Sequence, residues 1–174
     1  MIDLIYQYQY LKINFIKLES EYKKFRHEFK TQYDNLMKNK VYQSDILSTD
    51  IETIKESSEE FTKGKPQEGK ELFKFVAKYT HPDKVQNEIL NKIYIRASNA
   101  YESEDISELL YCVISIDSSY DIPNHYLVYL IEDIKLIEAK IDGIKKSHPY
   151  KYGMANERDK NKYMYDYIKS ELKV

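Results

Sequence analysis

A regular apolar pattern runs along the first part of the chain, where large apolar side chains recur in alternating steps of four and three residues. They are Leu4, Tyr8, Leu11, Phe15, Leu18, Tyr22, Phe25 and Phe29, with Leu36 further along. This is the spacing of a heptad seam. Neither Gly nor Pro precedes Gly64, so the pattern predicts one helix over about residues 3–38, roughly 50 Å long. A helix of this length needs a partner along its apolar face.

A second pattern of the same kind follows Pro123, a residue favoured in the first turn of a helix. Its apolar positions are Leu127, Leu130, Ile134, Ile137, Ile141 and Ile144. They predict a helix from Pro123 to about Lys146. We expect the two long helices to pair in an antiparallel hairpin within one chain, since that pairing has no concentration requirement. Two alternatives stay open: a homodimer through the heptad helices, and core faces of an ordinary helical bundle.

Two shorter helices flank a loop in the central part of the chain. One begins near Pro66 and ends at His81, because a residue that precedes proline is pushed out of the helical region. Apolar residues at helical spacing predict the other, from Leu90 to Tyr101. Upstream of both, a capping box predicts an acidic helix over about residues 50–62.

Further elements follow the central pair. Asp105 with Glu108 is placed to cap a short apolar helix that continues to Ile116. The stretch 147–153 is interpreted as a loop, and Asn156 as the start of a last helix. These elements indicate a chain of helices throughout.

Composition favours the same all-α fold. Four Gly and four Pro among 174 residues leave few turn residues for a sheet. We divide the chain into an N-terminal long helix (1–47), a central module (48–118) and C-terminal helices (119–174), of which the first pairs with the N-terminal helix. A net charge of -2 gives no global attraction to nucleic acid, so we do not expect nucleic-acid binding.

The sequence offers no pattern for a metal site or for catalysis. Cys112 is the one cysteine, and His27, His125 and His148 stand without a second ligand at metal-binding spacing. No nucleophile or phosphate-binding loop accompanies them. We therefore expect no enzyme activity, cofactor or metal. Without a basic leader or a window approaching roughly 18 apolar residues, we expect a cytoplasmic protein with no membrane partner.

The tripeptide His81-Pro82-Asp83 has the most defined chemistry in the chain. Proline fixes the geometry of the loop, and a carboxylate on an exposed loop can meet an arginine of a partner. The preceding helix adds lysines at steps of four, which form a basic stripe suited to an acidic surface. The predicted partner-binding residues are His81, Pro82, Asp83, Lys84, Lys70, Lys74 and Lys78.

This helix, loop and helix resemble a J-domain (DnaJ-like), the module by which cochaperones stimulate the ATPase of heat shock protein 70 chaperones. The family's third helix carries an Ala-Tyr pair about twenty residues after the tripeptide, where this chain has Ala100-Tyr101. The resemblance covers about residues 66–104. It implies that the loop contacts the chaperone where its nucleotide-binding and substrate-binding domains meet. It also implies a structural core that contains Phe73, Val76, Tyr94, Ala100 and Tyr101.

The chain departs from the common J-domain pattern in several places. The usual tyrosine and leucine signature of the first helix is missing, and Phe75 stands where a second basic residue is common. No glycine-phenylalanine-rich or cysteine-rich region follows. A J-like module between coiled-coil helices is similar to divergent J-like proteins of bacteria and large DNA viruses, which adds the host cytoplasm or the virion to the expected locations.

Two functional hypotheses follow. In the first, the protein is a J-domain cochaperone that binds a heat shock protein 70 chaperone and stimulates its ATP hydrolysis. In the second, it is a helical structural or assembly protein, for example of a viral particle, whose J-like core has no chaperone coupling. A further hypothesis places the acidic helix 50–62 against the basic stripe as an autoinhibitory contact.

Overall fold

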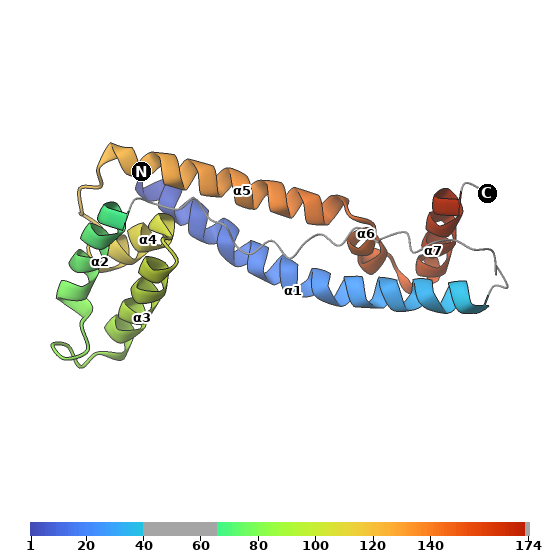
Figure 1. Ribbon diagram of the computed structural model, residues 1–174, viewed down its shortest axis with the longest axis horizontal. Helices are drawn as coiled ribbons and strands as arrows, with labels where there is room; N and C mark the ends of the chain where they lie inside the picture. The colour runs from blue at the N-terminus through green and yellow to red at the C-terminus, as the bar shows by residue number, and fades with distance from the viewer. Residues whose placement is uncertain (40–65, 173–174) are drawn as a thin grey trace. The chain divides into compact units, whose positions relative to one another are not determined.

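The computed structural model describes residues 1–39 and 66–172, and within them it contains helices and no β-strand (Figure 1). The elements are α1 (Ile2–Asn39), α2 (Pro66–Thr80), α3 (Glu88–Glu102), α4 (Ile106–Ile116), the 3₁₀ helix η1 (Asn124–Tyr126), α5 (Leu127–Lys146), α6 (His148–Met154) and α7 (Glu157–Leu172). The all-α prediction is confirmed. The acidic helix expected at 50–62, its autoinhibitory contact and the boundary expected at 47/48 lie outside the described residues.

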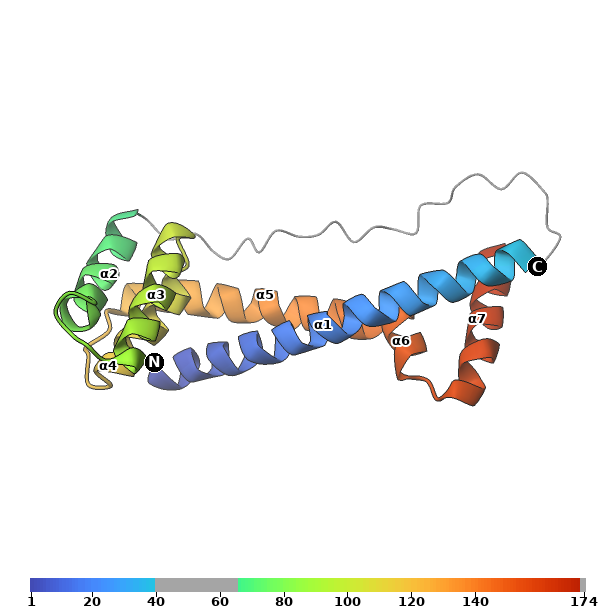
Figure 2. The ribbon, with the colours of Figure 1, turned by 90° about the horizontal axis from the view of Figure 1, so that it is seen from below.

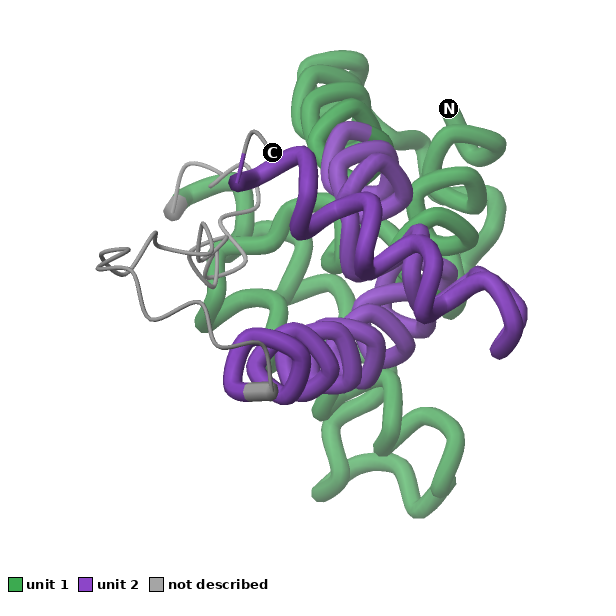
Figure 3. The backbone as a smooth tube through the Cα atoms, turned by 90° about the vertical axis from the view of Figure 1, so that its right-hand side faces the viewer, with its two compact units in different colours: residues 1–13, 57–138 green, residues 14–56, 139–174 purple. Residues whose placement is uncertain are grey.

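The chain forms two compact units, which Figure 3 colours separately. Among the described residues, unit 1 comprises 1–13 and 66–138, and unit 2 comprises 14–39 and 139–172. Helices α1 and α5 each contribute residues to both units.

Helix α1 follows the predicted range closely, and its heptad seam is the face that the protein buries. Tyr8, Phe15, Tyr22 and Phe29 are all buried. In unit 1 the Tyr8 hydroxyl donates to Asp105 at 3.2 Å, and in unit 2 the Phe29 ring packs edge-on against Tyr152. Because the seam meets several helices rather than one, it is the core face of a bundle. A homodimer through these helices stays a prediction.

Within unit 1 the antiparallel pairing expected for the two long helices is wrong, since the parts of α1 and α5 that belong to this unit run in the same direction (Figures 1 and 2). In unit 1, burial raises the pKa of the Tyr8 hydroxyl, and the charges of Asp105 and Glu108 and of Asp133 on α5 raise it further. In unit 2, the Lys140 ammonium lies 5.7 Å from the centre of the Phe15 ring. The physical reason is that α2–α4 intervene and return the chain to α5 beside the beginning of α1.

Helices α2, α3 and α4 pack against one another in unit 1. Helices α2 and α3 form an antiparallel hairpin whose loop is residues 81–87. The side chain of Asn87 ends this loop and caps α3 by accepting hydrogen bonds from the N–H groups of Ile89 and Leu90. The shared core of α2, α3 and α4 excludes water from large apolar side chains, which is the main driving force for this packing. The core residues include Leu72, Val76, Ala97, Ala100, Ile106, Leu109, Leu110 and Val113.

The joint between α3 and α4 is tight. The N–H of Glu104 donates to Tyr101 and that of Asp105 to Ala100, the two bonds of a Schellman motif. Glu104 has a φ of 60° at the position where glycine is usual. Asp105 then caps α4 by accepting the Glu108 N–H at 2.8 Å, as predicted. The Glu108 side chain bonds to other residues instead of completing a capping box.

In unit 2 the loop predicted at 147–153 is wrong and the predicted last helix is confirmed. The expected loop 147–153 is almost entirely the helix α6, because Ser147 caps it by accepting the Tyr150 N–H and Tyr152 is buried. The last helix begins where expected, with Asn156 accepting the Asp159 N–H at 3.0 Å. Its inner face joins a cluster formed by Phe29, Tyr152, Met164 and Ile168, bordered by Tyr33, Leu36, Met37, Tyr163, Tyr167 and Leu172.

Candidate functional site

The tripeptide His81-Pro82-Asp83 lies in a tight turn directly after α2. The His81 N–H still donates to Ala77 at 3.1 Å, as in the helix. The His81 carbonyl then accepts the N–H of Lys84 at 2.9 Å and that of Val85 at 3.1 Å. Pro82 takes the second position of this turn, where its fixed φ is favourable. The prediction that His81 ends the helix is confirmed.

His81 and Asp83 have different surroundings within this turn. The His81 ring packs edge-on against Tyr94 of α3, with 5.2 Å between ring centres. Its Nδ1 accepts the Asp83 N–H at 3.3 Å and lies 3.7 Å from the Asp83 carboxylate. The Asp83 side chain is 85% exposed. The turn therefore holds His81 against the hairpin and presents the Asp83 carboxylate to solvent.

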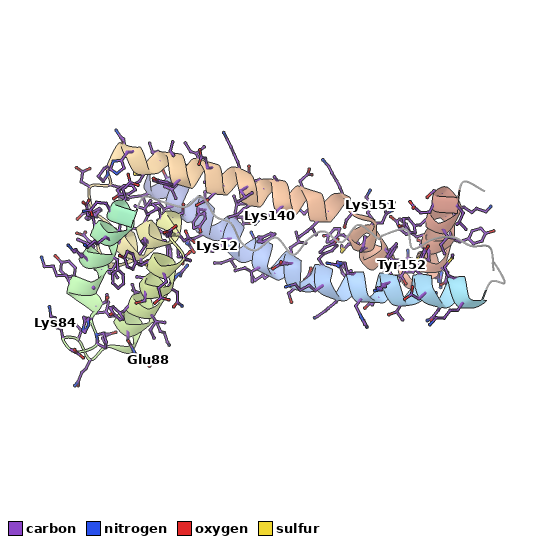
Figure 4. All side chains as sticks on the ribbon, in the orientation of Figure 1. Lys12, Lys84, Glu88, Lys140, Lys151 and Tyr152 are labelled. Carbon is purple, nitrogen blue, oxygen red and sulfur yellow. The ribbon has the colours of Figure 1, made fainter. Side chains whose placement is uncertain are left out.

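The predicted basic stripe is an exposed surface of α2. Lys70, Lys74 and Lys78 are exposed at successive turns. Lys84, labelled in Figure 4, is exposed in the loop. Within residues 1–39 and 66–172, no carboxylate lies within 4.0 Å of these four ammonium groups. The stripe thus offers positive charge that its own surroundings in the described structure do not neutralise.

The residues that the resemblance assigns to a J-domain core join α2 to α3. The rings of Phe73 and Tyr101 are stacked with centres 5.0 Å apart, and the Phe73 and Tyr94 ring centres are 6.0 Å apart. Val76 and Ala100 are buried. Since Tyr94 also supports His81, one line of rings runs from the core of the hairpin to the turn.

A buried polar network in unit 1 was missed from the sequence. The Lys12 ammonium, labelled in Figure 4, lies 2.9 Å from Asp105 Oδ2 and 2.8 Å from Glu108 Oε2. Arg96 Nε donates to Oε1 of Glu108. The Nη2 atom of Arg96 donates to Oε1 of Gln9 at 2.5 Å. Gln9 in turn donates to Glu108 at 3.0 Å. The network fastens the first turns of α1 to α3 and α4.

The charges of this network hold one another in their ionised forms. Burial alone would raise the pKa of Glu108, but Lys12 and Arg96 outweigh it and hold that pKa below its usual value. Burial would likewise lower the pKa of Lys12, yet Asp105 and Glu108 raise it. Burial raises the pKa of the Cys112 thiol on α4 to about 12. Lys12, Arg96 and Glu108 are therefore fixed structural charges and Cys112 is a neutral thiol, and none of them is suited to exchange protons near neutral pH.

Weak signals of this network exist in the sequence. Lys12 lies one turn after the seam residue Tyr8, and Glu108 opens an almost wholly apolar helix. Either residue alone is typical of a helix surface or a cap. Only the approach of α1 to α4 makes them partners.

Nothing in the described part of the chain forms a metal site, because no group of three His, Cys, Asp or Glu side chains there could hold an ion. Within the same residues no helix has both the length and the apolar character to cross a membrane. Comparison with known proteins adds no assignment: no family model, curated protein or solved structure matches the chain.

Proposed function

We propose that this protein is a J-domain cochaperone that binds a heat shock protein 70 chaperone and stimulates its ATP hydrolysis. The observation that carries the proposal is the Pro82-Asp83 turn at the tip of the α2–α3 hairpin, with Asp83 exposed and His81 packed on Tyr94. An arginine-bearing partner can form a charge-assisted pair with such a carboxylate.

The lysine stripe supports the same proposal. An acidic partner surface meeting Lys70, Lys74 and Lys78 would be attracted over a Debye length of about 8 Å at physiological salt. Long-range attraction then orients the encounter, and the Asp83 turn supplies the specific contact. The protein itself catalyses no reaction in this scheme, because the hydrolysis takes place on the chaperone.

The test is the steady-state ATPase of a purified heat shock protein 70 chaperone with and without the full chain. We expect stimulation that Asp83→Asn abolishes, because the amide keeps the shape of the side chain and removes its charge. Glu88→Gln is the matched control, since it removes an exposed carboxylate at the start of the neighbouring helix. Absence of stimulation by the unmodified chain with several such chaperones would refute the proposal.

The second candidate is a helical scaffold whose J-like core has no chaperone coupling. It is favoured by the exposed apolar residues Ile2, Tyr6, Tyr10 and Ile13, which lie on α1 outside the buried seam. An apolar stripe of this kind suits assembly with further protein. Sedimentation velocity over a range of concentrations distinguishes a monomer from a homodimer, and a concentration-dependent dimer without ATPase stimulation would favour this candidate.

A further inference from the structure

An aromatic ridge lies beside the lysine stripe on α2. We define it as Phe75, Tyr79 and Tyr120. The ring centres of Phe75 and Tyr79, one turn apart on α2, are separated by 5.1 Å, and those of Phe75 and Tyr120 by 4.6 Å. Tyr79 is 44% exposed, and the Lys78 ammonium lies 5.2 Å from the centre of its ring. The ridge thus combines exposed ring surface with cations.

Tyr120 comes from the connection between α4 and η1, outside the α2–α3 hairpin. Asp117 fixes this connection, because its carboxylate accepts both the N–H and the hydroxyl of Ser119, at 2.9 and 2.6 Å. The Tyr120 N–H donates to the Asp117 carbonyl at 3.2 Å. The turn is therefore ordered by local bonds, and it lays the Tyr120 ring on α2.

We propose that the ridge is a second contact surface for the chaperone of the proposed function, on which this inference rests. Its occupant would be an acidic protein surface that carries apolar side chains. Charge complementarity argues for this choice, since Lys74 and Lys78 border the ridge and no carboxylate of the described residues neutralises them. The exposed ring of Tyr79, with the half-buried rings of Phe75 and Tyr120 beside it, supplies contact area at little entropic cost.

The ridge would make recognition less dependent on charge. Phe75 stands where a lysine or arginine would add to the stripe, and it contributes apolar surface instead. Contacts between rings and apolar side chains are insensitive to ionic strength, whereas exposed ion pairs weaken as salt rises. The protein would therefore retain part of its affinity under conditions that screen the lysines.

The experiment measures the dissociation constant of the full chain for the purified chaperone between about 50 and 300 mM NaCl. The test variant is Tyr79→Ala, chosen because its ring is exposed and its loss leaves the core unchanged. The matched control is Tyr165→Ala on α7 of unit 2, whose ring is 43% exposed and lies 5.0 Å from the Lys169 ammonium. Lys74→Ala and Asp83→Asn complete the set, and circular dichroism checks that each variant is folded.

We expect Tyr79→Ala to weaken binding about fivefold at every salt concentration, as loss of an interface tyrosine does. Lys74→Ala should instead flatten the salt dependence, and Tyr165→Ala should bind like the unmodified chain.

Unchanged binding by Tyr79→Ala while Asp83→Asn abolishes stimulation overturns the ridge and leaves the proposed function standing. Weakening by Tyr79→Ala with no effect of Asp83→Asn supports the ridge and overturns the role of the turn. No binding by the unmodified chain overturns both.

Discussion

The two compact units bury different kinds of side chain. Unit 1 encloses ionised groups: Lys12 and Glu108 have side chains only 17% and 9% exposed, and they form an ion pair. Unit 2 encloses rings, with Phe29 packed edge-on against Tyr152 and Tyr167 at 5.4 and 5.0 Å between centres. One chain thus uses two means to fix its helices: unit 1 adds buried charge partners to its apolar core, and the core cluster of unit 2 packs rings against one another.

These two means respond to different perturbations. A buried ion pair tolerates small changes of volume but not the loss of one charge, because the remaining charge is then buried alone. A cluster of rings has no charge to lose but is close-packed, so an added methyl group lowers its stability.

Removal of the Glu108 charge should have the largest effect. Glu108→Gln leaves the ammonium of Lys12 with one fewer carboxylate, and we expect unit 1 to lose about 3 kcal/mol. Hydrogen exchange followed by mass spectrometry should show this loss in α4 and not in α7. The exposed pair of Glu88 and Lys92 is the control, since Glu88→Gln should cost less than about 0.5 kcal/mol. Equal losses of stability in Glu108→Gln and Glu88→Gln would contradict the role of Glu108 as a buried charge partner.

The same carboxylate predicts a dependence on pH. Folding lowers the pKa of Glu108 from its usual 4.5, so the folded state favours the ionised form. Its contribution to stability is complete above pH 4.5 and disappears as the pH falls through the lower folded value. Exchange protection of α4 should therefore decline as the pH falls from 4.5 through the lower folded pKa, and Glu108→Gln should remove this part of the decline. The ring cluster of unit 2 is uncharged over this range and should change less.

An added methyl group should have the next largest effect, in unit 2. A Cβ atom at Gly153 would overlap the ring of Phe25, so Gly153→Ala should destabilise this unit by about 2 kcal/mol. Gly143→Ala provides the control, because a Cβ there meets nothing within 4 Å. That control should be stabilising by up to about 1 kcal/mol, as alanine favours the helix interior. Protection of α6 and α7 in hydrogen exchange would distinguish the two outcomes.

The smallest effect concerns the joint of α3 and α4. Glu104 has a left-handed φ of 60°, which costs a residue with a side chain roughly 1 kcal/mol and costs glycine little. Glu104→Gly should therefore raise the stability of unit 1 by up to about 1 kcal/mol. Ser103→Gly should lower it, since Ser103 has an ordinary φ of -86°. A thermal unfolding curve of each variant gives the sign.

The sequence predicted most helices well, because their signals are local. The seam of α1, the cap at Asp105 and the break before Pro82 each depend on residues within a few turns. Helix α6 was missed for the opposite reason. It has seven residues, too few for intrinsic stability, and its formation depends on burial of Tyr152 among residues of α1 and α7.

The candidate site likewise has features that follow from local sequence and features that depend on the packed fold. The exposed turn at His81–Asp83 follows from the proline alone, and the lysine stripe follows from helical spacing. The support of His81 by Tyr94 and the position of Tyr120 on α2 require the packed hairpin. Likewise, the parallel direction of α1 and α5 within unit 1 depends on where α2–α4 return the chain, which no local pattern encodes.

The lone thiol of the chain has a practical consequence. Cys112 is fully buried on α4, and burial raises its pKa to about 12, so the thiolate that reacts with alkylating reagents is scarce and enclosed. Labelling with iodoacetamide therefore requires α4 to open. Since the chain has no second cysteine to react, the labelling rate of the unaltered protein measures how often unit 1 opens under native conditions. A partner that binds unit 1 and slows its opening would lower this rate, so its binding could be detected without an introduced probe.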